Sequence, residues 1–313
     1  MSSKRQLLAF AAALALASAS QFAQAQEVYI PLVSKGFQHQ FWQAVKSGAE
    51  QAGKDYKVKV TFEVPETEQQ VDKQIDMLSA ALAKKPSAIG FAALDSKAAI
   101  PLLKKAQAAH IPVIAFDSGV DSDIVLTTAQ TNSKAAAALA ADKMAEMIKG
   151  AGEVAVIGHD QTSTTGVDRR DGFVNQIKAK YPNIKLVDVQ YGGGDHLKSA
   201  EIAKTLLQAH PQLKGIFATN EGSAIGAGKG VKEAKKSVII IGFDSGKAQK
   251  DMIKDGTISG AITQNPVGIG YKTVEAAVKA LKGEKLPKII DTGFYYYDKG
   301  NMSDPKIAAV LYD

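Results

Sequence analysis

Two short segments of the chain are nearly identical, and this repeat constrains the fold more than any other feature. Residues 113–119 read VIAFDSG and residues 240–246 read IIGFDSG. Each apolar run ends in an acidic turn, which is typical of a strand buried on both faces of a parallel sheet. Because ligands bind beyond the carboxyl ends of such strands, the repeat predicts two α/β lobes that present Asp117 and Asp244 to one cleft. A turn or a helix N-cap is the alternative interpretation of either aspartate alone.

The rest of the chain alternates between short apolar runs and segments with helical spacing, which indicates βαβ units. Strands are predicted at residues 28–33, 58–64, 88–92, 111–116, 124–128, 154–157, 184–190, 216–219, 238–243 and 258–263. Helices are predicted between them, among others at 97–109, 132–149, 165–180, 195–208, 223–235 and 266–281. An extended aromatic tail at 289–297 and a short element at 305–312 complete the chain.

These patterns predict an α/β fold of two doubly wound parallel-sheet lobes joined by a multi-strand hinge. No low-complexity linker separates the halves, so the lobes are expected to exchange strands through several short crossings. We expect residues 26–131 and 265–292 to form the N-terminal lobe, and residues 132–264 and 293–313 to form the C-terminal lobe. Such a hinge permits the lobes to close around a ligand.

The first 25 residues predict export. Lys4 and Arg5 form a basic start, residues 7–17 form an apolar stretch, and Ala-Gln-Ala at 23–25 supplies a cleavage site. The apolar stretch is too short for a stable membrane span. A core helix is the structural alternative, but the three features in register favour a signal peptide at residues 1–25 and a periplasmic mature protein.

Composition excludes several classes of function. The formal net charge of +6 falls to +4 without Lys4 and Arg5, and it is spread without a strong block, so it does not argue for nucleic acid. The absence of cysteine excludes disulfides, thiolate metal sites and thiol chemistry. The length of 313 residues, 45% of them hydrophobic, is sufficient for two domains with cores.

The glycine-rich segments match no known nucleotide-binding motif. In the segment around Gly226-Ala-Gly-Lys-Gly, Ser223 stands where a P-loop has its first glycine, and Gly230 stands where it has a hydroxyl residue. The chain also lacks a Gly-x-Ser-x-Gly elbow and a His-x-x-x-His pair, so the hydrolase and zinc interpretations have no support. We therefore expect no cofactor and no metal.

Polar and aromatic residues follow the ends of several predicted strands, where a ligand of an open parallel sheet would lie. Carboxylates accept hydrogen bonds from vicinal hydroxyls, arginine and amide groups donate in planar arrangements, and aromatic rings stack on apolar C–H faces. Such a set suits a neutral polyhydroxylated ligand, although each residue alone also has a structural interpretation. The residues are Phe41, Trp42, Asp117, Arg169, Asn220, Asp244 and Gln264.

Six motifs occur in an order that resembles the type I periplasmic sugar-binding proteins of ABC importers, especially the ribose- and allose-binding branch. They are QHQFWQAVKSGAEQA, PVIAFDSG, VDRRDGF, IFATNEGSAIGA, VIIIGFDSG and AITQNPVGIGYK, and the resemblance covers residues 26 to about 282. The resemblance implies a role in ligand binding for eight residues. They are Phe41 and Trp42 as aromatic stackers, Asp117 and Asp244 as diol-binding aspartates, Arg169 as the sugar-clamping arginine, Asn220 and Gln264 as amides, and Lys35 as a pocket lysine of allose-type members.

Three positions depart from the family pattern and leave the identity of the sugar open. His39 stands where these relatives usually have asparagine, and Ser118 stands where ribose binders carry a second arginine. Gly194 stands where ribose binders stack an aromatic ring on the sugar. We include His39 and Ser118 among the predicted ligand-binding residues.

The resemblance implies a protein that captures a monosaccharide and delivers it to the membrane permease of an ABC importer. The sugar is expected to be a ribose-like pentose or an allose- or psicose-like hexose. The resemblance also implies a monomer without enzymatic activity, and it leaves contact with a chemoreceptor open. Repressors share this fold, but here a signal peptide occupies the place of their DNA-reading domain.

Two alternative functions remain at this point. One is a binding protein for a nucleoside or a furanone-type signal. The other is a secreted glycosidase that uses Asp117 and Asp244, which requires one carboxyl group with a raised pKa. Because a nearby Arg169 is expected to keep both carboxyl groups ionised, we consider the glycosidase less favoured.

Overall fold

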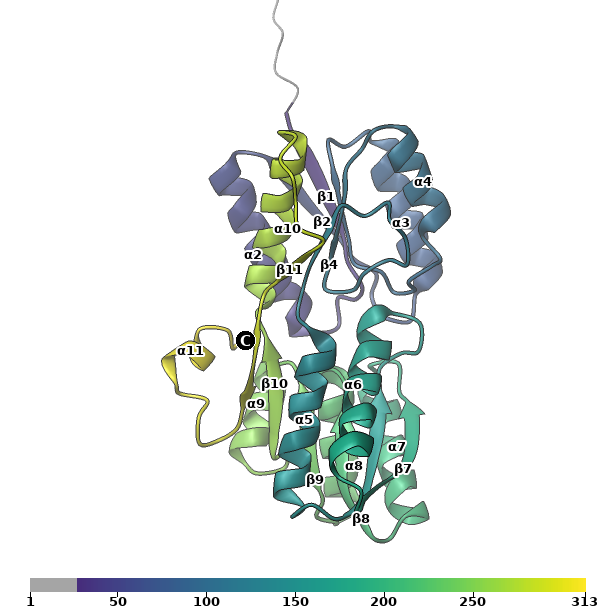
Figure 1. Cartoon of the computed structure of the whole chain (residues 1–313), viewed down its shortest axis with the longest axis vertical. Coiled ribbons are helices and arrows are strands. Elements are labelled where there is room, and N and C mark those ends of the chain that lie inside the picture. Colours follow the sequence, from purple (N-terminus) through teal and green to yellow (C-terminus); the bar gives the residue numbers. More distant parts are fainter. Residues whose placement is uncertain (1–26) are drawn as a thin grey trace, which may run out of the picture.

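The computed structural model describes residues 27–313, so the predicted signal peptide at residues 1–25 lies outside the described residues. The described chain forms two α/β lobes stacked along the long axis of the molecule, each built on a six-stranded sheet (Figure 1). The predicted fold class is therefore confirmed. None of the helices in this part of the chain combines the length and the hydropathy needed to cross a membrane.

The sheet of the first lobe is entirely parallel and has the strand order β11-β5-β4-β3-β1-β2. Its central strands are buried along their whole length, which explains their continuous apolar sequences. The strands are β1 (Tyr29–Val33), β2 (Lys59–Glu63), β3 (Ile89–Phe91), β4 (Val113–Phe116), β5 (Thr127–Gln130) and β11 (Ile289–Asp291).

The sheet of the second lobe has the order β12-β10-β9-β8-β6-β7, and only its edge strand β12 is antiparallel. The shared strand order shows that the two lobes repeat one topology, as the two Phe-Asp-Ser-Gly segments predicted. The strands are β6 (Gly152–Gly158), β7 (Ile184–Tyr191), β8 (Leu213–Ala218), β9 (Ile239–Phe243), β10 (Gly260–Gln264) and β12 (Phe294–Tyr297).

Helices cover both faces of each sheet and close four apolar cores. In the first lobe, α2 (Gln40–Tyr56) and α10 (Pro266–Leu281) cover one face, and α3 (Val71–Ala83) and α4 (Ile100–Ala108) cover the other. In the second lobe, α5 (Ser133–Met147) and α6 (Thr164–Lys180) cover one face, and α7 (His196–Ala209), α8 (Glu221–Glu233) and α9 (Lys247–Lys254) cover the other. The short helix α11 (Pro305–Ala308) belongs to the C-terminal tail.

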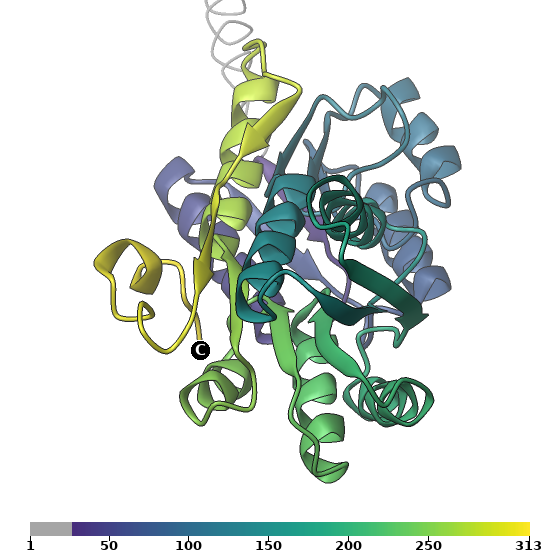
Figure 2. The same ribbon diagram turned by 60° about the horizontal axis from the view of Figure 1, so that its bottom comes forward.

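The chain crosses between the lobes three times. It passes from β5 to α5, returns from β10 to α10, and passes again from β11 to β12. Figure 2 shows the last crossing as an extended segment that runs from the first lobe into the second. Three short crossings constrain the lobes to move about a common axis.

The predicted strands are all present, but their ends differ from the observed ones by up to three residues. The strand expected at 124–128 is β5, which begins three residues later, because Val125 packs into the core from the preceding loop and the ladder begins only after Leu126. The extended tail at 289–297 divides into β11 and β12 at Gly293, whose φ of 78° interrupts the extended backbone. In both cases apolar character does not fix where the hydrogen-bonded strand begins and ends.

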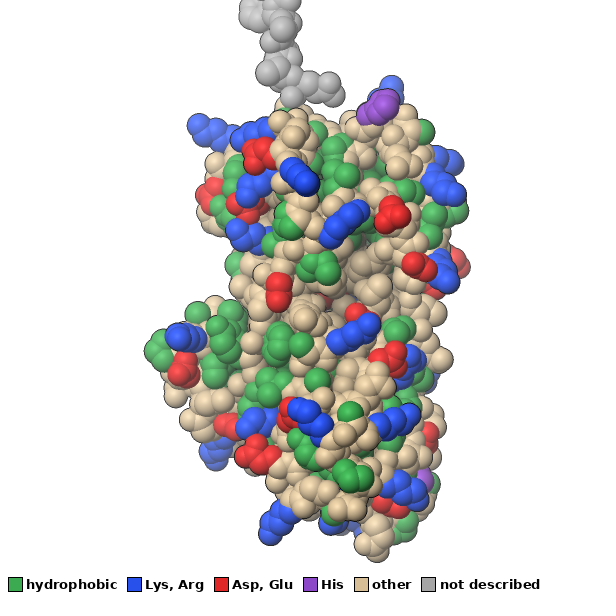
Figure 3. Space-filling view, in the orientation of Figure 1, with side chains coloured by type: hydrophobic (Ala, Val, Ile, Leu, Met, Phe, Trp, Pro, Cys, Tyr) green, Lys and Arg blue, Asp and Glu red, His purple; other side chains and the backbone are tan. Residues whose placement is uncertain are grey.

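Charged side chains of both signs are interspersed over the face in Figure 3, where no large patch of one sign is visible. Ion pairs on the surface include Lys134 with Asp168 at 3.4 Å and Lys97 with Asp121 at 3.7 Å. Exposed pairs of this kind contribute only about 0–1 kcal/mol each. The stability of the lobes therefore depends mainly on their apolar cores.

Helices α2 and α10 approach each other closely because glycines stand at their contact. A Cβ atom on Gly48 would lie 1.9 Å from the carbonyl oxygen of Val267, and a Cβ atom on Gly270 would lie 1.9 Å from that of Val45. Neither distance is compatible with a side chain, so these two glycines set the separation of the helices.

We expect Gly270→Ala to lower the free energy of unfolding by about 1–3 kcal/mol, the usual cost of overpacking. Alanine is the better helix former by only about 1 kcal/mol, which does not compensate for the overlap. Urea denaturation measures the effect, with Gln51→Ala on the exposed face of α2 as a control expected to stay within about 0.5 kcal/mol of the parent. A Gly270→Ala protein as stable as the parent would contradict this packing argument.

Candidate ligand-binding site

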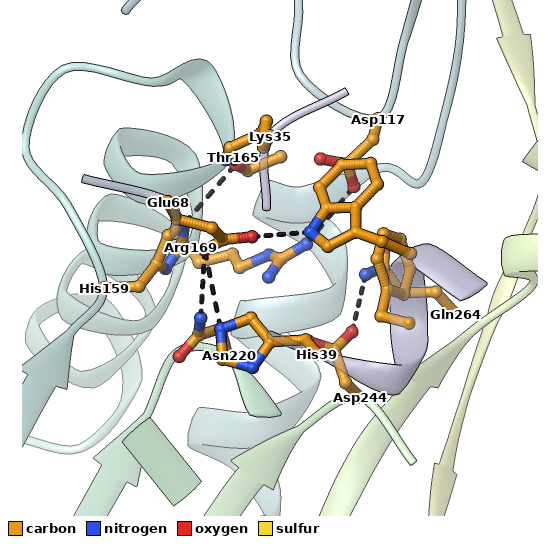
Figure 4. Close-up of a pocket in the computed structure, with 12 residues that line it drawn as sticks. Lys35, His39, Glu68, Asp117, His159, Thr165, Arg169, Asn220, Asp244 and Gln264 are labelled. Carbon is orange, nitrogen blue, oxygen red and sulfur yellow. Dashed lines mark hydrogen bonds and ion pairs between the residues drawn. The ribbon is translucent and has the colours of Figure 1, made fainter. Parts of the chain in front are cut away.

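A small cavity lies between the lobes, at the carboxyl ends of the parallel strands of both sheets. Figure 4 shows side chains from both lobes converging on it. Eleven of the twelve lining residues are buried, and Glu68 is partly exposed. The lining residues are Lys35, His39, Phe41, Trp42, Glu68, Asp117, His159, Thr165, Arg169, Asn220, Asp244 and Gln264.

The structure brings all the ligand-binding residues predicted from the sequence to this cavity except Ser118. Ser118 is buried, but its hydroxyl lies 3.3 Å from that of Thr164 on α6 and the residue is not part of the cavity wall. Asp117, with a φ of 55°, turns the chain here, so the next side chain meets the opposite lobe instead of the cavity. The role of the other nine residues in binding stays a prediction.

The two repeated aspartates occupy equivalent positions in the two lobes. Asp117 follows β4 and Asp244 follows β9, and both have left-handed backbones, with φ of 55° and 77°. The amide of Asp117 donates to the carbonyl of Ala129 at 2.9 Å, and the amide of Asp244 donates to that of Ile262 at 2.7 Å. Such conformations are uncommon outside glycine and cluster at functional sites. The neighbouring strands thus hold both carboxylates in place.

Arg169 reaches across the cavity from α6. Its Nη1 donates to the carbonyl of Thr219 at 2.9 Å, its guanidinium lies 3.8 Å from the centre of the Phe243 ring, and its Nη2 is 3.8 Å from Oδ1 of Asp117. The last distance is too long for a hydrogen bond. The guanidinium of Arg169 is therefore held in place, and it compensates the charge of Asp117 without occupying the hydrogen-bonding capacity of this carboxylate.

Several buried polar atoms in the cavity wall have no hydrogen-bond partner among the described residues. They include an acceptor on Asp117 (Oδ1), an acceptor on Gln264 (Oε1) and a donor on Arg169 (Nε). In contrast, Asp244 accepts hydrogen bonds from the Gln264 amide at 2.7 Å and from the backbone of Glu221 at 3.1 Å. Because buried polar groups are normally paired, these atoms indicate where a polar ligand would bind.

Burial changes the ionisation of both aspartates. It raises the pKa of Asp117 to about 6, although Lys35 and Arg169 act in the opposite direction. Burial also raises the pKa of Asp244, against the effects of Arg169 and of the hydrogen bond from Gln264. Arg169 favours the ionised form of both carboxyl groups, as expected, but desolvation is the larger influence and the net shift of both pKa values is upward.

Phe41 and Trp42 occupy the first turn of α2, and Trp42 contributes both to the cavity and to the core. Its ring packs edge-on against Phe41 at 4.9 Å and against Phe116 at 6.3 Å. Its indole Nε1 donates to Oε1 of Glu68 at 2.8 Å. Trp42 thus lines the cavity and packs into the core of the first lobe at the same time.

Three lining residues were not predicted. His159 directly follows β6, so the strand-end criterion would have found it if the strand had been extended past Ile157. Thr165 lies in the first turn of α6, and Glu68 lies in the loop after β2. No sequence pattern indicates Glu68, because it joins the wall through contacts with distant segments. Besides the hydrogen bond from Trp42, its carboxylate accepts one from the amide of Asn220 in the second lobe at 3.3 Å.

Lys35 is a buried cation that links the two lobes. Its Nζ lies 3.2 Å from the hydroxyl of Thr165, 3.4 Å from that of Ser163 and 3.8 Å from Oδ2 of Asp160. Burial raises the pKa of Asp160, but His159, Lys35 and the hydrogen bonds from Ser163 together lower it to about 2. Asp160 is thus an ionised partner for the lysine at neutral pH.

Two more ionisable groups complete the electrostatics of the wall. Burial lowers the pKa of His159 to about 4, so its imidazole is neutral, and its Nδ1 lies 2.7 Å from the hydroxyl of Thr219. Burial raises the pKa of Glu68, but the charges of Lys35 and His39 outweigh it and the net shift is downward. Among residues 27–313 no group of His, Cys, Asp and Glu side chains is arranged to hold a metal ion.

Contacts between the lobes enclose the cavity. The amide of Gly119 donates to the hydroxyl of Thr164 at 2.8 Å, and the amide of Ser96 donates to the carbonyl of Thr162 at 3.1 Å. Because nearly all lining side chains are buried, a ligand reaches this cavity only when the lobes separate.

Comparisons with known proteins agree with this geometry. The chain matches the family model of the periplasmic binding protein domain over residues 30–285. It is 27% identical over 265 residues to a D-ribose/D-allose-binding protein of Pseudomonas aeruginosa, with 82% of each chain covered. It is also 30% identical over 269 residues to a ribose import binding protein of Bacillus subtilis, with 85% of each chain covered.

Solved structures show the same similarity. A carbohydrate transporter solute binding protein from Agrobacterium radiobacter, in complex with D-arabinose, is 36% identical with a TM-score of 0.88, covering 92% of this chain and 99% of that chain. An ABC transporter solute binding protein from Agrobacterium vitis with bound D-fucose is 33% identical with a TM-score of 0.87, covering 91% of this chain and 100% of that chain. The match of the family model, which spans most of the sequence, shows that this chain belongs to the periplasmic binding protein family.

Proposed function

We propose that this protein binds a monosaccharide between its two lobes and delivers it to the permease of an ABC importer. The observation that carries the proposal is the enclosed cavity, which combines aromatic rings with acidic, basic and amide side chains from both lobes. The cavity is small and is enclosed by side chains of both lobes. A single sugar ring fits such a space better than an oligosaccharide.

The chemistry of the wall suits the two kinds of surface on a sugar. Asp117 and Gln264 offer acceptors for hydroxyl groups, and Arg169 offers a donor. Phe41 and Trp42 offer apolar surface for the C–H faces of the ring. A ligand that contacts both lobes would favour the closed arrangement, in which it makes more contacts. The three crossings would serve as the hinge between the lobes, whose boundaries are those predicted from the sequence.

The names of the relatives suggest the sugars to test first. They include proteins for D-ribose, D-allose and D-apiose, and solved complexes with D-arabinose and D-fucose. A thermal-shift screen over these sugars, followed by calorimetry, tests the proposal because a ligand that binds only the folded state raises the melting temperature. If no pentose or hexose in the screen shifts the melting temperature and a nucleoside does, the ligand class proposed here is wrong.

The cellular setting follows from the family. We propose that the predicted signal peptide directs the chain to the periplasm, and that a monomer with closed lobes contacts the permease. A chemoreceptor is a second candidate partner for the same closed form. Pull-down of the membrane permease with the sugar-loaded protein as bait tests the proposed contact with the permease.

We further propose that the protein has no glycosidase activity. Because the pKa of Asp117 is raised, the charge of Arg169 does not by itself prevent this carboxyl group from acting as a general acid. The proposal depends instead on the relatives, which are transport proteins. Incubation with simple glycosides, followed by measurement of released sugar, tests the point directly. Turnover that disappears in Asp117→Asn would establish an enzyme instead.

Removal of one cavity carboxylate should weaken sugar binding strongly. Asp244→Ala leaves the amide of Gln264 without its partner, and loss of one member of a desolvated charged pair costs about 2–5 kcal/mol. We therefore expect at least a tenfold increase in Kd by calorimetry. Asp76→Ala, at an exposed position of α3, is the matched control and should leave Kd unchanged. An Asp244→Ala protein that binds within twofold of the parent would remove this residue from the site.

Trp42 should report binding by its fluorescence. It is the only tryptophan of the chain and lines the cavity. Because its indole Nε1 is bonded to Glu68, a sugar that changes this contact or covers the ring changes the emission. We expect a saturable change in intensity or wavelength with the same Kd as calorimetry gives. A flat emission spectrum during a titration with calorimetrically proven binding would contradict the role of Trp42.

The affinity should decrease in mildly acidic solution. Burial raises the pKa of Asp117 in the free protein to about 6, whereas a sugar hydroxyl that donates to this carboxylate favours the ionised form. Binding below this pH therefore releases a proton, and Kd should increase by up to about tenfold per pH unit as the pH falls below about 6. Calorimetry in this acidic range measures the effect, and Asp117→Asn should weaken the dependence. An equally steep profile in Asp117→Asn would assign it to another group.

A further inference from the structure

Helix α2, which carries Phe41 and Trp42, is capped by the opposite lobe. Its N-cap residue, His39, makes no side-chain capping bond, and its first turn contains no acidic residue. Instead, the amide of Gln40 donates to Oε1 of Glu221 at 3.2 Å, and Glu221 begins α8 of the second lobe. A carboxylate at this position satisfies a free N–H group and interacts favourably with the helix dipole.

At helix α9 the roles are reversed, and a residue of the first lobe caps a helix of the second. Its N-cap residue is Gly246, which has no side chain to cap the helix. The amide of Lys247 donates to Oε1 of Gln40 at 2.6 Å, and Gln40 belongs to the first lobe. Gln40 and Glu221 therefore form a cross-lobe double cap, in which each lobe caps a helix of the other.

The double cap lies directly behind the cavity and does not line it. The backbone amide of Glu221 donates to Oδ2 of Asp244 at 3.1 Å, so the capping residue also holds a cavity carboxylate. The Glu221 side chain is closely enclosed, since a Cβ atom on Gly246 would lie 2.6 Å from its Cδ. The double cap thus connects the position of α2 to that of Asp244.

The C-terminal tail completes this arrangement. The hydroxyl of Tyr312 donates to Oε2 of Glu221 at 3.2 Å and accepts from the amide of Ser245 at 3.1 Å. Its ring packs edge-on against Phe41 at 6.2 Å. Tyr312 therefore fixes the Glu221 carboxylate from the side opposite to Gln40.

We propose that Gln40 and Glu221 are positioning residues that hold the lobes closed and so determine how long the sugar stays bound, without contacting it. This inference depends on the proposed sugar-binding function. Both bonds join different lobes, so separation of the lobes breaks both and leaves the first turns of α2 and α9 without these acceptors. Since the contacts form only after the lobes meet, their loss should increase koff and leave kon nearly unchanged.

The expected size of the effect follows from measured helix caps. Loss of a cap corresponds to about a two- to thirtyfold change in an equilibrium constant. We therefore expect Gln40→Ala and Glu221→Ala each to increase koff by a factor in this range. Burial and the neighbouring Asp244 raise the pKa of Glu221 to about 7, so the measurements are made at about pH 8, where the carboxylate is ionised.

The experiment measures koff by stopped-flow Trp42 fluorescence, with whichever of D-ribose, D-allose, D-arabinose and D-fucose raises the melting temperature most. Gln51→Ala on α2 and Glu233→Ala at the far end of α8 are matched controls at exposed positions. Both controls should dissociate at the parent rate. Double-cap variants that dissociate within twofold of the parent would overturn the proposal.

Hydrogen exchange supplies a readout that a general loss of stability would not give. Gln40→Ala should accelerate exchange at the amide of Lys247 in the other lobe, and Glu221→Ala should accelerate exchange at the amide of Gln40. If no sugar of the thermal-shift screen binds, the proposed function is contradicted, and the same comparison without sugar still decides on the double cap. Unchanged exchange at both amides would overturn it.

Discussion

The position of the cavity depends on two aspartates that are held in left-handed backbone conformations. Asp117 and Asp244 end equivalent strands of two similar sheets, and each is fixed by a backbone hydrogen bond to the next strand. Such a backbone is unfavourable for a residue with a Cβ atom, so it persists only because the adjacent strand compensates for it. The same turn, repeated in both lobes, directs two carboxylates into one space.

Two largely buried ion pairs join the lobes at the cavity. Arg169 of the second lobe faces Asp117 of the first, and Lys35 of the first lobe faces Asp160 of the second, each pair at 3.8 Å. Breaking a buried pair leaves an uncompensated charge, which is strongly unfavourable. The charges therefore favour approach of the lobes, while the long distances leave hydrogen-bonding capacity for a ligand between them.

Sequence patterns predicted the fold and most of the cavity because both follow from the ends of parallel strands. Asp117, Asn220, Asp244 and Gln264 each stand at the end of a strand or within two residues after it, where topology alone places them at the cleft. Glu68 has no such signal, since it enters the wall by accepting hydrogen bonds from the indole of Trp42 and the amide of Asn220, both distant in the sequence. Spacing along the chain cannot encode a contact that exists only after the helix and the loop have packed.

The shape of one wall depends on a residue without a side chain. Gly194 has a φ of 67°, and a Cβ atom there would lie 2.8 Å from Nδ2 of Asn220 and 3.1 Å from Nε2 of His39. A large side chain at this position would displace the cluster of His39, Glu68 and Asn220 that now closes this side. The glycine and the histidine, which were both predicted to depart from the family pattern, thus lie side by side in one wall. Because Gly194 adds no ring to this wall and the groups beside it are polar, we expect selectivity on this side of the cavity to depend on hydrogen bonding more than on stacking.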